Sequence, residues 1–146
     1  MQAISNRILG VVSGVVMGAA AAGAAGQCDP ADLFGPDQQF ATGGSPNSVA
    51  IGDLDGDGTP DLAVANSSSS SNSVSVLLGN GDGTFQPRQH FTTGFSPQSV
   101  AIGDLDGDGT PDLATANFGF NEPSSVSILL GNGDGTFQAR QDFITG

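Results

Sequence analysis

The chain has 146 residues, and its 15 acidic residues outnumber its three basic ones, so the formal net charge is −12. Such a chain has too few cations to neutralise phosphates, which excludes nucleic acid as a partner. Its length fits one domain, and its 23 glycines and eight prolines predict a β-rich fold with many tight turns.

Residues 1–26 have the layout of a secretory signal peptide. Arg7 precedes an uncharged apolar stretch, "ILGVVSGVVMGAAAAGAAG", which ends in small residues before a polar segment. We expect cleavage at those small residues, which leaves residues 27–39 as an N-terminal linker. Because Ala and Gly dominate the second half of the stretch, we expect no stable membrane span after cleavage. The protein is therefore predicted to be secreted or at the cell surface, in an extracellular or periplasmic location. Cys28 is the only cysteine, so no internal disulfide can form.

The remainder of the chain is an internal repeat. The segment "IGDLDGDGTPDLA" occurs twice at an offset of 51, and "GNGDGTF" occurs twice at an offset of 52. The single inserted residue falls in a segment whose composition differs between the copies, which is typical of an exposed loop. We expect a first repeat at residues 40–90, a second at 91–142, and the start of a third, "FITG", at 143–146.

Within each repeat, apolar residues alternate with smaller or polar ones at a period of two. Val49 and Ile51 show this before the aspartate-rich segment, and Val74 and Val76 show it afterwards. Each repeat predicts a strand, an aspartate loop, a strand, a variable loop, a strand, a tight hairpin and a short fourth strand, at residues 84–86 in the first repeat. Four antiparallel strands in about 50 residues make one blade of a β-propeller. The predicted fold is all-β, with two four-stranded propeller-type blades that form a partial propeller.

Four aspartates alternate with other residues in each copy of "DLDGDGTPD", and the two copies hold eight of the 15 acidic residues. Curling such a loop directs the carboxylates inward, and its glycines permit the positive φ angles that the curl needs. Calcium fits because it takes roughly six to eight hard oxygen ligands, whereas zinc prefers His or Cys and magnesium retains more of its water. We expect about two structural calcium ions, one in the loop between the first and second strands of each repeat. The predicted ligands are Asp53, Asp55, Asp57, Thr59 and Asp61 in the first repeat and Asp104, Asp106, Asp108, Thr110 and Asp112 in the second.

An acidic turn without a metal is the alternative interpretation of these loops, since Asp-Gly pairs are common in turns. A plain turn, however, needs one such pair and not four carboxylates in register. An EF-hand is excluded, because Val64 stands where its closing Glu belongs, and the flanking segments predict strands.

The second acidic motif, "GNGDGTF", predicts a hairpin with Asp82 and Asp134 in the turns. Phe85 and Phe137 are expected to pack between the blades. His90 is the only histidine and has no counterpart in the second repeat, which favours a surface position. Because no nucleophile is paired with it, we expect no enzymatic activity.

Together, "SVAIGDLDGDGTPDLAVAN" and "SVSVLLGNGDGTF" resemble the VCBS/FG-GAP class of repeat, over residues 40–146. That class occurs in secreted β-propellers and in integrin α-chain head domains. The resemblance implies calcium at the predicted ligands, and a secreted module for adhesion or for binding an extracellular glycan or protein. An accessory, non-catalytic domain of a secreted polysaccharide-acting enzyme is the alternative. Closed propellers have roughly four to eight blades, so two repeats favour a fragment of a longer propeller. Self-assembly of several chains and a swap of the "FITG" strand into a neighbouring blade are the alternatives.

Overall fold

The fold is known for most of the chain that follows the predicted signal peptide. The residues that the computed structural model describes are 37–68, 71–121 and 123–145. The chain divides into two units, Met1–Gln39 and Phe40–Gly146, and every strand of the described residues belongs to the second unit. The predicted signal peptide and most of the predicted linker lie outside the described residues. Within the described part, no helix is long and apolar enough to cross a membrane.

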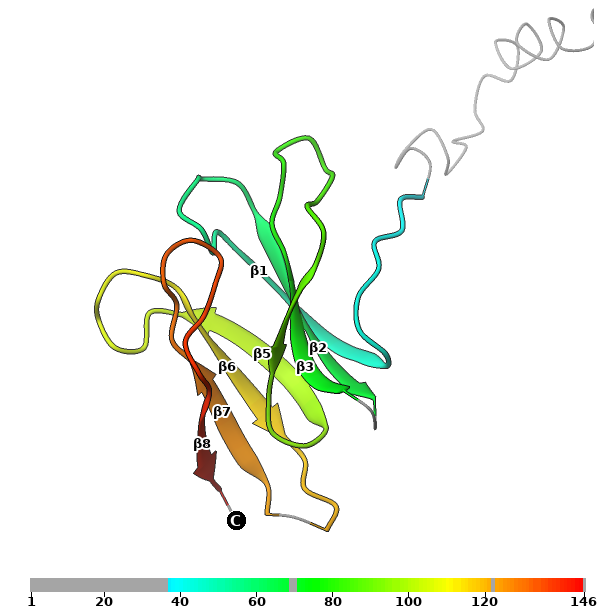
Figure 1. Cartoon of the computed structure of the whole chain (residues 1–146), viewed down its shortest axis with the longest axis vertical. Helices are drawn as coiled ribbons and strands as arrows, with labels where there is room; N and C mark the ends of the chain where they lie inside the picture. The colour runs from blue at the N-terminus through cyan, green and yellow to red at the C-terminus, as the bar shows by residue number, and fades with distance from the viewer. Residues whose placement is uncertain (1–36, 69–70, 122, 146) are drawn as a thin grey trace, which may run out of the picture. The chain divides into compact units, whose positions relative to one another are not determined.

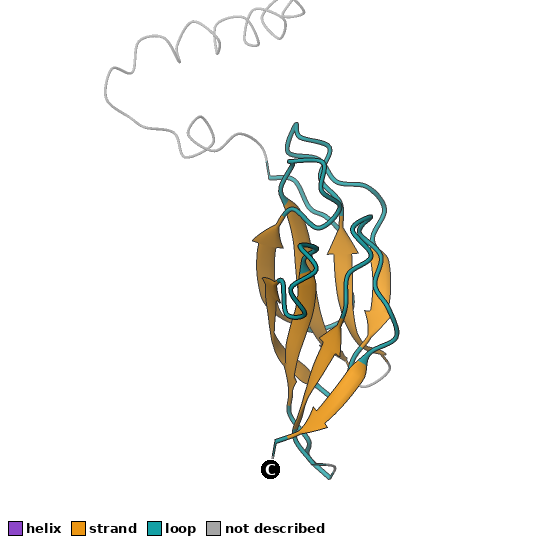
Figure 2. Ribbon diagram, turned by 90° about the vertical axis from the view of Figure 1, so that its left-hand side faces the viewer, coloured by secondary structure: helices purple, strands orange, loops and turns teal. Residues whose placement is uncertain are grey.

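Two four-stranded antiparallel sheets make up the second unit (Figures 1 and 2). The first sheet contains β1 (Pro46–Gly52), β2 (Asp61–Ser68), β3 (Ser71–Leu77) and β4 (Gln89–Thr92). The second contains β5 (Pro97–Gly103), β6 (Asp112–Asn117), β7 (Ser125–Leu129) and β8 (Gln141–Ile144). In each sheet, strands that are adjacent in sequence are also paired in space. The prediction of an all-β fold is confirmed, and the two sheets fit blades of a β-propeller-like fold.

The hydrophobic core lies between the two sheets. Small residues of β2, Ala63 and Ala65, are fully buried, and so are Val74 and Val76 of β3. Because these residues alternate along their strands, they share one face of the first sheet, and that face packs against the second sheet. The buried members of the core are Leu54, Ala63, Ala65, Val74, Val76, Leu78, Val100, Leu113, Leu129 and Phe137. The predicted period of two identified the buried face of β3, but Val49 and Ile51, the alternating apolar residues of β1, are exposed.

The fourth strand of each sheet lies further along the chain than expected. The prediction of a strand at residues 84–86 was wrong, because Phe85 forms only an isolated bridge with Gly79. The chain then leaves β3 and returns to it at β4, where Phe91 pairs with Val74. The hairpin turn and the fourth strand are thus separate features, and the same bridge-then-strand order recurs in the second sheet.

Because of this pairing, the sheets do not begin and end at the same residues as the sequence repeats expected at 40–90 and 91–142. Phe91, the expected first residue of the second repeat, lies in the last strand of the first sheet. Phe143 likewise lies in β8, the last strand of the second sheet. The "FITG" segment therefore contributes to the second sheet up to Ile144, and each blade ends with the residues that the sequence pattern placed at the start of the next.

The phenylalanines form two T-shaped pairs, one of which joins the two blades. Phe137, which follows β7, packs against Phe91 of β4, with ring centroids 5.1 Å apart and an interplanar angle of 78°. This contact joins the two sheets, as predicted for Phe137. Phe85 instead pairs with Phe40, which precedes β1, at 4.9 Å and 81°. Both aspartate loops and both hairpins lie at the same end of the sheets (Figure 1), so their backbones can contact one another.

Candidate metal centre

Each aspartate loop connects the first two strands of its sheet and is curled by its first aspartate. In the first loop, the Gly56 N–H donates to Asp53 Oδ1 at 2.8 Å and the Gly58 N–H donates to Asp53 Oδ2 at 2.9 Å. Gly56 and Gly58 have φ angles of 79° and 85°, which side chains with a Cβ rarely adopt. Asp104 makes the equivalent pair of bonds in the second loop, at 2.7 and 3.0 Å. The alternation of Asp and Gly is therefore what the curl requires.

Asp61, the last aspartate of the first loop, is fully buried and closes the loop at its base. Its Oδ2 accepts the Leu54 N–H at 2.7 Å, and its Oδ1 accepts the Gly79 N–H at 2.7 Å. One carboxylate thus ties the aspartate loop to the hairpin that follows β3. Asp112 is 1% exposed and makes the same two bonds in the second sheet, both at 2.8 Å.

The partner of this carboxylate was missed by the sequence reasoning. A Cβ on Gly79 would lie 2.3 Å from the carbonyl oxygen of Pro60, so only glycine lets the hairpin approach the loop this closely. The first glycine of "GNGDG" recurs in both repeats, and that recurrence was the available signal. Thr59 also reaches the hairpin, since its hydroxyl lies 3.4 Å from the Gly79 carbonyl oxygen.

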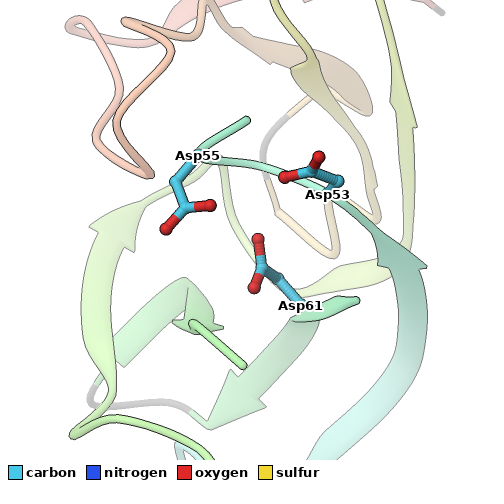
Figure 3. Close-up of side chains that lie close together, drawn as sticks. All are labelled: Asp53, Asp55 and Asp61. Carbon is cyan, nitrogen blue, oxygen red and sulfur yellow. The ribbon is translucent and has the colours of Figure 1, made fainter. Parts of the chain in front are cut away.

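Three carboxylates converge in the first loop. Oxygen atoms of Asp53, Asp55 and Asp61 all lie within 4.8 Å of one another, and Figure 3 shows the three groups directed toward a common space. In the second loop, the corresponding group is Asp104, Asp106 and Asp108. The structure therefore brings together three of the predicted ligands in each loop. The first two aspartates belong to the cluster in both loops. The third member is the last aspartate, Asp61, in the first loop and the third aspartate, Asp108, in the second.

The remaining predicted ligands make other contacts. Asp57 Oδ1 accepts both the N–H and the hydroxyl of Thr59, at 2.7 and 2.5 Å. Asp108 Oδ1 accepts the same two groups of Thr110 at 2.7 and 2.5 Å, yet remains in its cluster. Asp112 is in its buried closing position and is outside the cluster of the second loop. Thr59 and Thr110, expected to offer backbone carbonyls, contribute donors to the neighbouring aspartates.

The charges within the first loop repel one another. The pKa of Asp55 is raised, first by burial of its carboxyl and then by repulsion from Asp57, Asp61 and Asp53, although an N–H bond from Asp57 opposes the rise. The pKa of Asp57 is lowered because the hydroxyl and N–H of Thr59 stabilise its ionised form. The loop therefore concentrates negative charge around Asp55, whose carboxyl gains protons more readily than an isolated aspartate.

No basic side chain of the described residues offsets this charge. Arg88 donates to the carbonyl oxygen of Thr42 and to His90 Nε2. Arg140 pairs with Asp142 at 3.0 Å. A buried carboxylate needs a compensating charge or strong hydrogen bonds. Asp61 receives two backbone N–H bonds but no compensating charge from a basic side chain of the described residues. The donor set is entirely of hard oxygens with no His or Cys, which fits calcium or magnesium and not zinc.

A family model described as an FG-GAP-like repeat matches residues 60–115. The match supports an FG-GAP repeat protein. It runs from the start of β2 through the whole of the second aspartate loop, so it spans parts of both sheets and includes Asp104, Asp106 and Asp108. No curated protein and no solved structure matches the chain.

Proposed function

We propose that each aspartate loop binds one calcium ion and that the chain is a secreted, calcium-stabilised repeat module. The observation that carries the proposal is the convergence of three carboxylates within 4.8 Å, without a basic side chain in contact within the described residues. The FG-GAP-like match at residues 60–115 supports the same class of module.

The proposed ligands are the carboxylates of the two loops, with the Thr59 and Thr110 carbonyls completing the shells. A carboxylate offers about four lone-pair positions, so Asp57 and Asp61 keep acceptor capacity beyond the backbone bonds they already receive. Calcium tolerates such irregular oxygen shells, whereas magnesium requires near-octahedral geometry. The pKa of Asp55 is raised by burial and then by repulsion from neighbouring aspartates, and a bound cation would offset that repulsion.

The proposed role of the metal is structural. The loop that would hold it is tied by Asp61 to the hairpin after β3, so ordering the loop also orders the end of the sheet. Calcium at 100 times its dissociation constant stabilises a folded protein by about 2.7 kcal/mol per site. Extracellular calcium modules bind in the range of about 10⁻⁴–10⁻³ M, which is compatible with a secreted protein.

We propose no catalytic role for the described residues. His90 Nε2 receives a hydrogen bond from Arg88 Nε at 2.8 Å, and because Arg only donates, that nitrogen must be the unprotonated one. The proton then lies on Nδ1 and points to the hydroxyl oxygen of Ser75, 3.2 Å away. In that tautomer Nδ1 is a donor and not a base toward Ser75, which is itself fully buried.

Calorimetric titration of the full chain with calcium and with magnesium tests metal binding. The informative variant is Asp55→Asn with Asp106→Asn, because each Asn oxygen can still accept the loop N–H that the aspartate accepts now. We expect this variant to lose at least about 10-fold in calcium affinity, equivalent to about 1.4 kcal/mol per site.

The matched control for this titration is Asp82→Asn with Asp134→Asn. It removes the same charge from the hairpin turns, where the aspartates accept from Thr84 and Thr136, and it should bind calcium like the natural chain. Equal losses in both variants would mean that net charge alone, and not the loop, attracts calcium.

Adhesion or binding of an extracellular glycan or protein is the biological role we propose for the module. It is tested by binding of the full chain to immobilised glycans and extracellular matrix proteins, in millimolar calcium and in excess chelator. Calcium-dependent capture is the expected result, and capture that ignores the chelator would separate ligand binding from the metal.

A further inference from the structure

The first sheet exposes residues that the second sheet buries. Val100 of β5 is 8% exposed, and Ile102 is partly buried against the core. Their equivalents one repeat earlier, Val49 and Ile51 of β1, are 56% and 69% exposed. We call Val49 and Ile51 the β1 face. The second sheet contacts the first through Val100 and Ile102, whereas the equivalent β1 face has no such contact among the described residues.

The second sheet, in turn, exposes residues that the first sheet buries. Leu54 is 1% exposed and Phe91 is packed against the core. Their equivalents one repeat later, Leu105 and Phe143, are 52% and 54% exposed. We call Leu105 and Phe143 the β8 face. The first sheet contacts the second through Leu54 and Phe91, whereas the equivalent β8 face has no such contact among the described residues.

The two exposed faces are therefore the two halves of an interface that the molecule already contains. We propose that the β1 face of one copy binds the β8 face of a second copy, in the arrangement of the internal sheet-to-sheet interface. That interface supplies the expected contacts: a T-shaped phenylalanine pair, and a hydrogen bond from Asn47 Nδ2 to the Pro97 carbonyl oxygen at 3.0 Å. In the complex, Phe143 of the second copy packs against Phe85 of the first, as Phe91 packs against Phe137.

Phe40 holds that position on Phe85 in the single chain. The Phe40–Phe85 pair has nearly the geometry of the pair between the sheets, and the carbonyl oxygen of Thr42 accepts from Arg88. Phe40 is nevertheless 36% exposed, so it covers the site incompletely. Phe143 of a second copy must displace it, and residues 40–43 therefore act as a competitor of association.

Association of this kind is head-to-tail, because the two contacting faces are different. Each copy then keeps one free face, and the series ends only when a ring closes. Rings of roughly four to eight blades correspond to two to four copies of this two-sheet chain. The association requires no metal, so a negative result for it would not count against the proposed calcium binding.

Sedimentation of the full chain at about 1–100 µM tests the proposal, and it is run in about 1 M NaCl, where repulsion between acidic chains is screened beyond about 3 Å. The test variants are Val49→Asp on the β1 face and Phe143→Asp on the β8 face. Both positions lie outside the aspartate loops. The matched control is Phe120→Asp, at a 77% exposed residue on the connection between β6 and β7.

The natural chain and the Phe120→Asp control are expected to form closed oligomers of two to four copies. Each face variant should associate at least about 100-fold more weakly, because a carboxylate replaces an apolar contact. An equimolar mixture of the two face variants should form a one-to-one heterodimer and nothing larger, since each partner retains one intact face. That mixture also shows that both variants fold. Phe40→Ala should strengthen self-association by removing the competitor.

A natural chain that stays monomeric throughout this range overturns the proposal. So does a mixture of the two face variants that forms no heterodimer, or a control that dissociates like the face variants. Calcium titration of Phe143→Asp distinguishes this failure from failure of the metal site, because that variant should bind calcium with unchanged stoichiometry.

Discussion

Replacing Asp61 by Asn should destabilise the fold even when no metal is present. Asp61 is fully buried, and its two oxygens accept the N–H groups of Leu54 and Gly79. An Asn has one acceptor oxygen, and its amide group is a donor. Asp61→Asn therefore sets a donor against one of the two N–H groups and leaves that group buried without an acceptor.

The expected loss can be estimated from those two bonds. An unsatisfied buried backbone group costs about 1–3 kcal/mol, and a hydrogen bond to a charged group is worth about 1.5–3 kcal/mol. Removing one bond and weakening the other should lower the free energy of unfolding by about 2–4 kcal/mol. The assay is urea unfolding in excess chelator, followed by far-UV circular dichroism, because the chain contains neither Trp nor Tyr.

Asp55→Asn is the control for this experiment. Within the loop, Asp55 accepts the Asp57 N–H at 3.2 Å, and an Asn oxygen can replace that acceptor. In chelator, Asp55→Asn should be neutral or slightly stabilising, because it removes a carboxylate whose pKa is raised first by burial and then by repulsion from the neighbouring aspartates. If Asp61→Asn were as stable as the natural chain in chelator, the buried carboxylate would not hold the loop to the hairpin, and the reasoning would be refuted.

Two further predictions concern the hairpin that Asp61 contacts. Gly79→Ala should lower the free energy of unfolding by about 1–3 kcal/mol through overpacking, because its Cβ would lie 2.3 Å from the Pro60 carbonyl oxygen. Gly103→Ala is the control and should be tolerated, because its Cβ would have no atom within 4 Å. Urea unfolding compares the two variants. The pKa of Asp82 is lowered by the hydroxyl and N–H of Thr84, so its stabilisation is present above the ordinary value of 3.8 and is lost as the pH falls through the folded-state value. Thr84→Val should raise that pKa toward 3.8, as measured by NMR titration of the Asp82 carboxyl, and an unchanged pKa would contradict the assigned cause.

The strands could be predicted from the sequence, but the limits of each sheet could not. Alternation of apolar residues identified the first three strands of each repeat, since side chains on one face recur at every second position. It did not identify the buried face of β1, where Val49 and Ile51 are exposed. The fourth strand was missed because "QHFT" was assigned in part to the next repeat. A repeating sequence defines a period but not a starting point, and the starting point depends on pairing such as that of Phe91 with Val74.

The candidate site was predictable in its composition and only partly in its arrangement. The two loops have the same sequence, yet Asp61 joins the cluster of the first loop and Asp112 does not join that of the second. Their surroundings differ: Leu54 is buried, and its carbonyl oxygen accepts the Gly135 N–H of the second sheet at 3.2 Å, whereas Leu105 is exposed. Such contacts connect residues far apart in the chain, so local spacing could not reveal them.

A thermal melt of the full chain in calcium and in excess chelator shows whether calcium stabilises the fold. With free calcium at about 100 times the dissociation constant, two sites would add about 5 kcal/mol in total, and each kcal/mol raises the midpoint of a domain of this size by about 4–8 °C. We predict a cooperative β-sheet melt that rises by about 20 °C or more in calcium and is unaffected by an equal concentration of sodium chloride. A melt with the same midpoint in calcium and in chelator would contradict the claim that the aspartate loops are calcium sites.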